Sequence, residues 1–442
     1  MSSETYPLRH SGIYRNLPTF DPSIKGLRAI VCGATGISGF NTLRSLLDTP
    51  DRWSVVYALS RRPLPQNMLD LLTPEQQARI KFVSVDLTRP GKEVAQILRS
   101  AGVAAEYAFF YSYMTPNNVA SMSPESADAL ADTNVPLFDH FLQALSLAGI
   151  VLKRILLQTG GKNYGMHIGR VRTPLVESDP QPKHLQINFY YEQEKLLCDY
   201  CKKNTGTKWN TVRPAGIVGA VGNAAINTFY PFAVYAAVQQ EKKEALFFGG
   251  DFDSWQMQAV HSTARLTGYL SEWAVLEEKC KDQAFNAHDG AGLSWDRFFG
   301  ELARWYNVES GLIGPSEDEG KYHVLEMKGG KEAPLGYGPP LTVRRTFSLA
   351  TWAQDPLNRK AWEALMARSG GTLRANPFDN IDTMFAGDFA YLNFGTLSCN
   401  KLRRFGFNGF VDTLESIFES FVENASLGLL PPVQVSCAHP LI

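Results

Sequence analysis

The first half of the chain alternates short apolar runs with longer segments in which apolar residues recur at helical spacing. The apolar runs predict strands at 27–33, 53–60, 78–87, 105–113, 152–160 and 208–219. Helical spacing predicts helices at 39–49, 133–149 and 191–204. Strands separated by helices need crossover connections, which make the strands parallel and place helices on both faces of the sheet. The pattern therefore predicts an α/β fold with a doubly wound parallel sheet.

The pattern becomes irregular after about residue 216. It predicts helices at 226–240, 294–308 and 410–426, short strands at 244–250 and 283–290, and a loop-rich region at 311–380. We expect a nucleotide-binding domain at 1–215, whose first 25 or so residues form an N-terminal extension. A smaller, mostly helical substrate lobe should follow at 216–442, partly interleaved with the first domain.

Composition and charge exclude several classes of protein. The 442 residues are 44% hydrophobic, and 43 Lys and Arg against 44 Asp and Glu give a formal charge of -1, so we expect no nucleic-acid partner. No apolar run is long enough to span a bilayer, and the first 18 residues lack the apolar centre of a signal peptide, which predicts a cytoplasmic protein without membrane insertion. The eight histidines lack metal-ligand spacing, and Cys198 and Cys201, the one cysteine pair with C-x-x-C spacing, have no second ligand pair, so no metal site is expected.

Three glycines, Gly33, Gly36 and Gly39, connect the first of these strands to the helix that follows it. A tight turn there brings free N–H groups and the positive end of a helix to one point, where a pyrophosphate fits. The spacing is G-x-x-G-x-x-G, and an ordinary strand-to-helix turn would look the same.

The end of the next strand indicates which dinucleotide binds. Sites for NAD usually carry an acidic residue there, whereas Arg61 and Arg62 after Ser60 offer guanidinium groups suited to a 2′-phosphate. The expected cofactor is NADPH. Asp86 should lie beside the adenine, although it could simply end a strand.

A proton donor beside the nicotinamide is expected to be a tyrosine near a lysine, because an ammonium group favours the phenolate. Lys162 and Tyr164 follow the strand that ends near residue 160. Tyr191 and Lys195 form a Y-x-x-x-K pair, which a solvated helix face would explain equally well, and Tyr190 precedes it. His167 and His261 could reach the same cleft, but structural roles are the commoner explanation for such residues.

The motifs "LQTGGKNYG" (157–165), "NFYYEQE" (188–194), "VRPAGIVG" (212–219) and "FNGF" (407–410) resemble one branch of the extended short-chain dehydrogenases/reductases, that of progesterone 5β-reductase and iridoid synthase. The resemblance implies a Rossmann-type fold and a catalytic pair made of Lys162 and Tyr190, whereas the Y-x-x-x-K pattern implies Tyr191 with Lys195. Adjacent helical residues point about 100° apart, so only one tyrosine faces the nicotinamide, and we favour Tyr190. The cofactor contacts expected from the loop and the resemblance are Gly33, Thr35, Gly36, Ile37, Gly39, Ser60, Arg61, Arg62, Asp86, Leu87, Tyr111, Ser112, Gln158, Thr159, Lys162, Pro214 and Ile217.

The sequence also departs from that branch. Asn163 stands where the branch has histidine, and Lys195 stands where it has an acidic residue. Ile168 occupies a position that is usually phenylalanine, and "MFAGD", with Met384, Phe385 and Ala386, replaces W-F-G-D. These changes imply a pocket of different shape, with room for a bulkier or non-steroid substrate. The expected substrate contacts are Tyr113, Tyr164, Ile168 and Phe385.

The sequence therefore predicts an NADPH-dependent reductase of an activated C=C bond (an enone or enal) or of a carbonyl in a hydrophobic small molecule of specialised metabolism. A non-redox isomerase, epimerase or dehydratase on the same fold is the main alternative, and a nucleotide-sensing regulator is a weaker one. The sequence leaves open whether the protein forms a homodimer.

Overall fold

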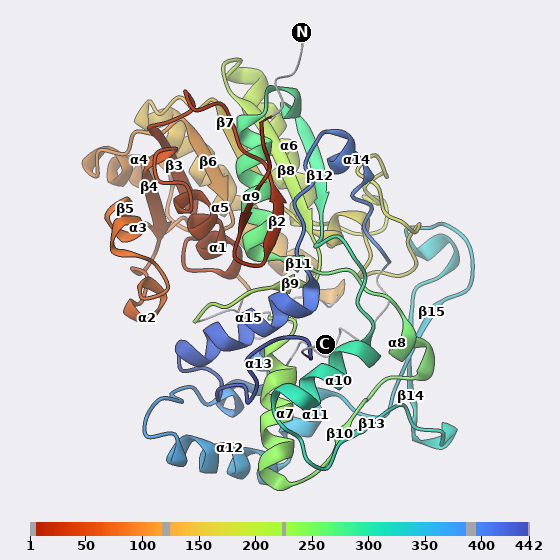
Figure 1. The fold of residues 1–442 in the computed structure, drawn as a ribbon. Helices are drawn as coiled ribbons and strands as arrows, with labels where there is room; N and C mark the ends of the chain where they lie inside the picture. Colours follow the sequence, from red (N-terminus) through yellow and green to blue (C-terminus); the bar gives the residue numbers. More distant parts are fainter. Residues whose placement is uncertain (1–5, 117–123, 223–226, 386–394, 441–442) are drawn as a thin grey trace.

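A computed structural model of the chain describes residues 6–116, 124–222, 227–385 and 395–440. Its centre is a seven-stranded sheet in the order β12-β8-β7-β6-β3-β4-β5, in which all neighbouring strands are parallel (Figure 1). These strands are β3 (Leu27–Cys32), β4 (Trp53–Ser60), β5 (Ile80–Ser84), β6 (Tyr107–Phe110), β7 (Arg154–Gln158), β8 (Lys208–Pro214) and β12 (Gln283–Ala287). The strand order reverses between β3 and β6, and in open α/β sheets a ligand binds beyond the carboxyl ends of the strands at such a point.

Helices cover both faces of this sheet. Helices α1 (Ile37–Leu47) and α9 (Ala264–Leu276) pack against each other and share one apolar core with β3, β4 and β6. Helices α4 (Gly91–Ser100), α5 (Ala127–Ala148) and α6 (Phe189–Lys203) enclose a second core on the other face. The predicted doubly wound parallel sheet is confirmed.

The second half of the chain builds a lobe that lies below the sheet in Figure 1. Its main helices are α7 (Tyr230–Lys242), α10 (Trp295–Trp305), α12 (Pro356–Arg368) and α15 (Thr413–Ser426). They share a core rich in aromatic side chains, in which Phe232, Phe298, Phe299, Trp305 and Trp362 are completely buried. This core is separate from the two that flank the sheet.

Shorter elements complete the described part of the chain. The strands are β1 (Arg9–Ser11), β2 (Tyr14–Leu17), β9 (Ile217–Val218), β10 (Leu246–Phe247), β11 (Ser262–Thr263), β13 (Leu312–Ile313), β14 (His323–Met327) and β15 (Leu341–Arg345). The helices are α2 (Gln66–Leu69), α3 (Pro74–Ala78), α8 (Phe252–Gln256), α11 (Leu349–Ala353), α13 (Ile381–Met384) and α14 (Asn400–Arg404). Within the described residues, no helix combines the length and apolarity needed to cross a membrane.

The structure adds to the sequence predictions and corrects one of them. The predicted strand at 283–290 contains β12, which pairs with β8 and extends the main sheet. Helix α9, which the pattern did not predict, packs beside α1 although it follows residue 216. The region predicted as loop-rich, 311–380, contains β13, β14, β15, α11 and α12. The second half of the chain therefore contributes to both lobes.

Candidate active site

In the glycine loop between β3 and α1, neighbouring backbone segments lie too close together for side chains at Gly33 and Gly39. Gly33 has a φ of +77°, and a Cβ there would lie 2.9 Å from the backbone nitrogen of Ser112. A Cβ on Gly39 would collide with the carbonyl oxygen of Gly33. In the described part of the chain no side chain caps the start of α1 at Gly36, so the first-turn N–H groups stay available to a phosphate. The loop fits the pyrophosphate of a dinucleotide.

Two arginines follow β4, at the end of the strand next to the loop. Arg61 and Arg62 are exposed, and neither guanidinium forms a hydrogen bond or ion pair with any described residue. The Ser60 hydroxyl donates to the carbonyl of Arg62 at 2.7 Å and holds this turn. Burial raises the pKa of nearby Asp86, but hydrogen bonds from Thr88 and the charge of Arg61 outweigh it and lower the pKa below its ordinary value. The turn presents positive charge to solvent.

At the end of β6, the main chain of Tyr111 lies next to Gly33 of the glycine loop. The Tyr111 N–H donates to the Cys32 carbonyl at 3.0 Å, and the Tyr111 ring packs against the core beneath α1 and α9. Burial raises the pKa of Tyr111 to about 12. We therefore expect any cofactor contact of Tyr111 to come from its main chain. Tyr113, 39% exposed, lies with its ring centroid 5.8 Å from that of Phe189.

The end of β7 is joined to the glycine loop by a side-chain hydrogen bond. Gln158 Nε2 donates to the hydroxyl of Ser38, in the first turn of α1, at 2.8 Å. Gly160 follows, and a Cβ there would lie 3.2 Å from the carbonyl oxygen of Pro214 and 3.4 Å from the hydroxyl of Tyr190. Strands β7 and β8 and the start of α6 therefore meet at one point beside the glycine loop.

Asn188 joins the main chains of Lys162 and Tyr190 at this point. The Asn188 side chain caps α6 by accepting from the Tyr190 N–H at 3.0 Å, and its amide donates to the Lys162 carbonyl at 2.9 Å. Burial lowers the pKa of Lys162 to about 8. Burial, with a smaller contribution from Tyr113, raises the pKa of Tyr190 well above its ordinary value. Tyr190 is therefore a protonated hydrogen-bond donor at neutral pH, and Lys162 carries a charge that it can lose close to neutral pH.

The competing pair, Tyr191 and Lys195, does not share an environment. Tyr191 is 3% exposed and lies under the Lys183 ammonium, which is 5.9 Å from its ring centroid. The Lys195 side chain is 63% exposed, and its Nζ pairs with Asp199 at 3.2 Å. The hydroxyl and ammonium groups of the Y-x-x-x-K pattern thus lie in different surroundings, one buried and one in solvent.

A buried polar network supports the turn Gly161–Tyr164 that carries Lys162. The Tyr164 hydroxyl donates to Asn286 Oδ1 at 2.6 Å and accepts from Arg213 at 3.1 Å. Arg213 also forms an ion pair with Glu194 at 3.0 Å. Sequence reasoning missed Asn188, Arg213 and Asn286. Only Asn188, placed just before a helix, gave a readable capping signal.

The four residues expected to contact the substrate lie in different parts of the structure. Ile168 is 9% exposed and lies on the segment that carries Lys162, and Tyr113 is near the start of α6. Tyr164 is 2% exposed and engaged in the polar network, so its position does not support a substrate contact. Phe385 has no exposed surface and packs against Trp352 and Phe378 in the lobe's core, which likewise does not support a place on a pocket wall. Ala386 lies outside the described residues.

Two buried histidines flank this region. Burial, reinforced by the charge of Lys162, lowers the pKa of His167 to about 4. Burial alone lowers that of His261 to about 4, and its ring lies against Phe229 with centroids 4.9 Å apart. Both imidazoles are therefore neutral at pH 7. No cluster of metal-ligating side chains occurs among the described residues.

The doubly wound parallel sheet and the glycine loop are features of a Rossmann fold, and the similarity to known proteins places the chain among enzymes of the short-chain dehydrogenase/reductase class. A family model described as a PRISE-like Rossmann-fold domain matches residues 29–326, about two thirds of the chain. The chain belongs to this family.

Known proteins similar to the chain agree with that assignment. It is 29% identical to the short chain dehydrogenase gsfE of Penicillium aethiopicum, over 91% of this chain and 99% of that protein. It is 26% identical to the (S)-8-oxocitronellyl enol synthase of Antirrhinum majus, over 91% and 92% of the two chains. Among solved structures, a UDP-glucose-4-epimerase of Stenotrophomonas maltophila has a TM-score of 0.51 and 14% identity, over 66% of this chain and 87% of that one. This last likeness concerns the fold alone.

Proposed function

We propose that the protein is an NADPH-dependent reductase that adds hydride to the β-carbon of an enone or enal in a hydrophobic small molecule. The observation that carries the proposal is the shared anchoring of Lys162 and Tyr190 by Asn188 at the carboxyl end of β7. This end of the sheet adjoins the glycine loop, to which Gln158 is hydrogen-bonded through Ser38. The names of the dehydrogenase and enol synthase relatives support the reductase class.

The chemistry divides between the cofactor and two side chains. NADPH, when bound, supplies the hydride. Because the pKa of Tyr190 is raised by burial, its hydroxyl keeps its proton and donates a hydrogen bond to the carbonyl oxygen of the substrate. That oxygen gains negative charge as the β-carbon is reduced, so the donor acts as an oxyanion site. The Lys162 ammonium adds a positive charge to the same region and favours the enolate.

Isotope transfer tests this reaction. We expect deuteride from 4-deuterated NADPH to appear at the β-carbon of an enone or enal product, located by NMR. Deuterium on a carbinol carbon would instead mean direct reduction of a carbonyl. Product formed with no net consumption of NADPH would contradict the proposal and support an isomerase or epimerase.

The proposed preference for NADPH over NADH rests on Arg61 and Arg62, which are exposed beside Ser60 and whose guanidinium groups have no hydrogen-bond or ion-pair partner among the described residues. Each charge-assisted hydrogen bond to a 2′-phosphate contributes about 1.5–3 kcal/mol. We expect the double substitution Arg61→Ala, Arg62→Ala to raise the Kd of NADPH at least about tenfold while changing that of NADH little. Binding titrations with both cofactors measure this, and Arg99→Ala, at an exposed arginine at the end of α4, is the control. Equal losses for NADPH and NADH would contradict the assignment.

A further inference from the structure

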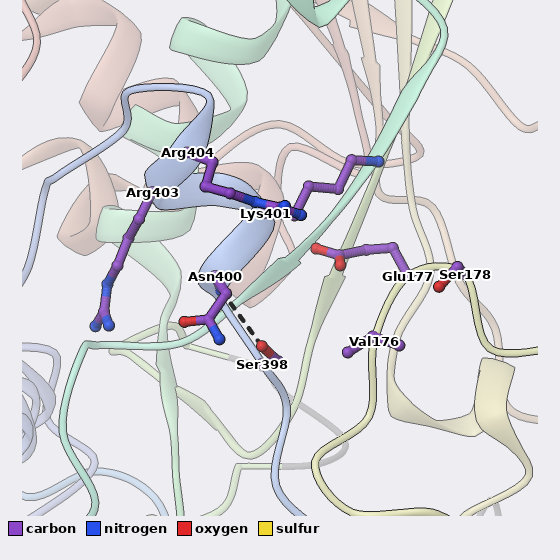
Figure 2. A pocket seen from close by; sticks show the side chains of 8 residues that line it. All are labelled: Val176, Glu177, Ser178, Ser398, Asn400, Lys401, Arg403 and Arg404. Atoms are coloured by element: carbon purple, nitrogen blue, oxygen red, sulfur yellow. Dashed lines mark hydrogen bonds between the residues drawn. The ribbon is translucent and has the colours of Figure 1, made fainter.

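A second site lies at the edge of the sheet that carries β12, where two distant segments enclose a cavity of about 790 Å³. We call this cavity the basic pocket. One wall is the segment 176–178, and the other comes from Ser398 and helix α14 (Figure 2). The residues that line it are Val176, Glu177, Ser178, Ser398, Asn400, Lys401, Arg403 and Arg404. None of them belongs to the glycine loop or to the tyrosine–lysine site.

Hydrogen bonds fix the two walls relative to each other. The Leu175 N–H donates to the Thr396 carbonyl, and the Ser398 N–H donates to the Leu175 carbonyl, both at 2.8 Å. The Asn286 amide, on β12, donates to the carbonyls of Leu175 and Ser398 at 3.1 and 3.2 Å. The pocket is therefore preorganised rather than formed by loose loops, which reduces the entropic cost of binding.

The charges around the pocket are unbalanced. Three cationic residues, Lys401, Arg403 and Arg404, line the pocket, and Glu177 supplies the one carboxylate among its lining residues. One Glu177 oxygen accepts the Asn286 N–H at 2.9 Å, so this side chain is held in the wall. Burial lowers the pKa of Lys401 against the opposing charge of Glu177, and the charges of Arg213 and, least of all, Arg404 lower it further. Positive charge is thus concentrated beyond what the protein itself neutralises.

The three cationic side chains are not equally available to a ligand. Lys401 Nζ donates to the Ala284 carbonyl at 2.9 Å and lies 5.2 Å from the ring centroid of Phe285. Arg403 donates to the Gly290 carbonyl at 3.3 Å, and Figure 2 shows its side chain directed away from Arg404 and Glu177. Arg404 is exposed, and its guanidinium has no hydrogen-bond or ion-pair partner in the part of the chain that the structure describes. The guanidinium N–H groups of Arg404 are therefore available to a ligand, and the Lys401 ammonium is a fixed positive charge beside them.

We propose that the basic pocket binds a compact phosphate-bearing anion at a site separate from the dinucleotide. A guanidinium fork matches two oxygens of a phosphate, and the nearby ammonium adds a second positive charge. A ligand with several negative charges, such as a diphosphate, satisfies both groups and offsets the Glu177 carboxylate.

The pocket also shares a hydrogen-bonded wall with the active site. Glu177 accepts from the Asn286 main chain, and the Asn286 side chain accepts from the Tyr164 hydroxyl at 2.6 Å. Tyr164 ends the turn that carries Lys162. An anion bound beside Glu177 is therefore linked through Asn286 and Tyr164 to the turn that carries Lys162. A change in kcat when the anion binds would be a second measure of occupancy.

Isothermal titration of the full-length protein with pyrophosphate tests the proposal. Saturating NADPH keeps the glycine loop occupied. In titrations without NADPH, the changes in affinity in Arg404→Ala and Glu177→Gln identify the basic pocket independently of the proposed cofactor. We expect Arg404→Ala to weaken pyrophosphate binding about tenfold or more, because a charge-assisted contact is lost. Glu177→Gln should tighten it, because the amide keeps an oxygen for Asn286 but removes the opposing charge.

The control is Arg172→Ala. Arg172 is exposed, lies in the same segment between residues 164 and 189 as the wall 176–178, and does not line the pocket. This variant should bind pyrophosphate as the wild type does. Absence of pyrophosphate binding to the wild-type protein, both with and without NADPH, would overturn the proposal. So would an affinity that is unchanged in both Arg404→Ala and Glu177→Gln, or equally tight binding of citrate, which would show that the pocket does not select phosphate.

Discussion

The turn after β7 and the outer face of α6 each place a lysine near a tyrosine in the sequence. The two lysines differ in their burial and in their partners. In the turn, Lys162 is largely buried and its pKa falls to about 8, while Asn188 ties its backbone to that of Tyr190. On α6, Lys195 is 63% exposed and forms an ion pair with Asp199.

This contrast shows that burial, rather than spacing, prepares a lysine for chemistry. An exposed ion pair is weak, because both of its charges stay hydrated and are screened by salt. A lysine held in a poorly hydrated site is destabilised in its charged form, so its proton can be exchanged near neutral pH. The i,i+4 spacing of Tyr191 and Lys195 therefore reflects a helix surface in this protein.

The strongest test of the contrast is Tyr190→Phe, which removes one hydroxyl and keeps the ring. We expect kcat to fall by about 10²–10³, as on loss of one oxyanion-hole donor, while the Kd of NADPH stays nearly unchanged. Steady-state kinetics and a cofactor titration measure the two effects. A turnover close to that of the wild type would remove Tyr190 from the mechanism.

Lys162→Met should have the next largest effect, a fall in kcat of about 10², and it should also alter the pH profile. Lys162 is cationic below its pKa of about 8 and neutral above it, so the wild-type kcat should decrease as the pH rises through that value. The methionine side chain of the variant cannot titrate, and its profile should lack this step. If both proteins showed the same inflection near pH 8, another group would be responsible for it.

Substitutions of Tyr191 and Lys195 on α6 should change turnover only slightly. We expect Tyr191→Phe and Lys195→Met to keep turnover within about twofold of the wild type, since substitutions away from the reacting groups usually have little effect. Thermal unfolding measured beside the kinetics separates a stability change at the buried Tyr191 from a catalytic one. A large loss in Tyr191→Phe together with a nearly normal Tyr190→Phe would reverse the assignment.

The local pattern predicted the parallel sheet well because each β3–β8 strand is a short apolar run beside a helix. It did not place β12, a five-residue strand in an irregular region, because its partner β8 lies about 70 residues earlier and parallel pairing leaves no local signature. Helix α9 was missed for a related reason: almost all its residues are buried, so it has no polar face to give a helical period.

The candidate site, like the fold, could be predicted only where its residues form a local motif. The glycine loop and the motifs around Lys162 and Tyr190 were visible because their spacing is local. The roles of Arg213 and Asn286 depend on contacts with Glu194 and Tyr164 across 19 and 122 positions, which no short motif encodes. The burial of Phe385 likewise depends on Trp352 and Phe378, which the fold brings around it.

The hydrogen bond from Gln158 to Ser38 has a mechanical consequence. It fastens the first turn of α1 to the last residue of β7, four positions before Lys162. A pyrophosphate bound at α1 would therefore be connected through one hydrogen bond to the strand end that precedes Lys162. We expect Gln158→Ala, which removes this bond, to loosen the alignment of the cofactor with Lys162 and Tyr190.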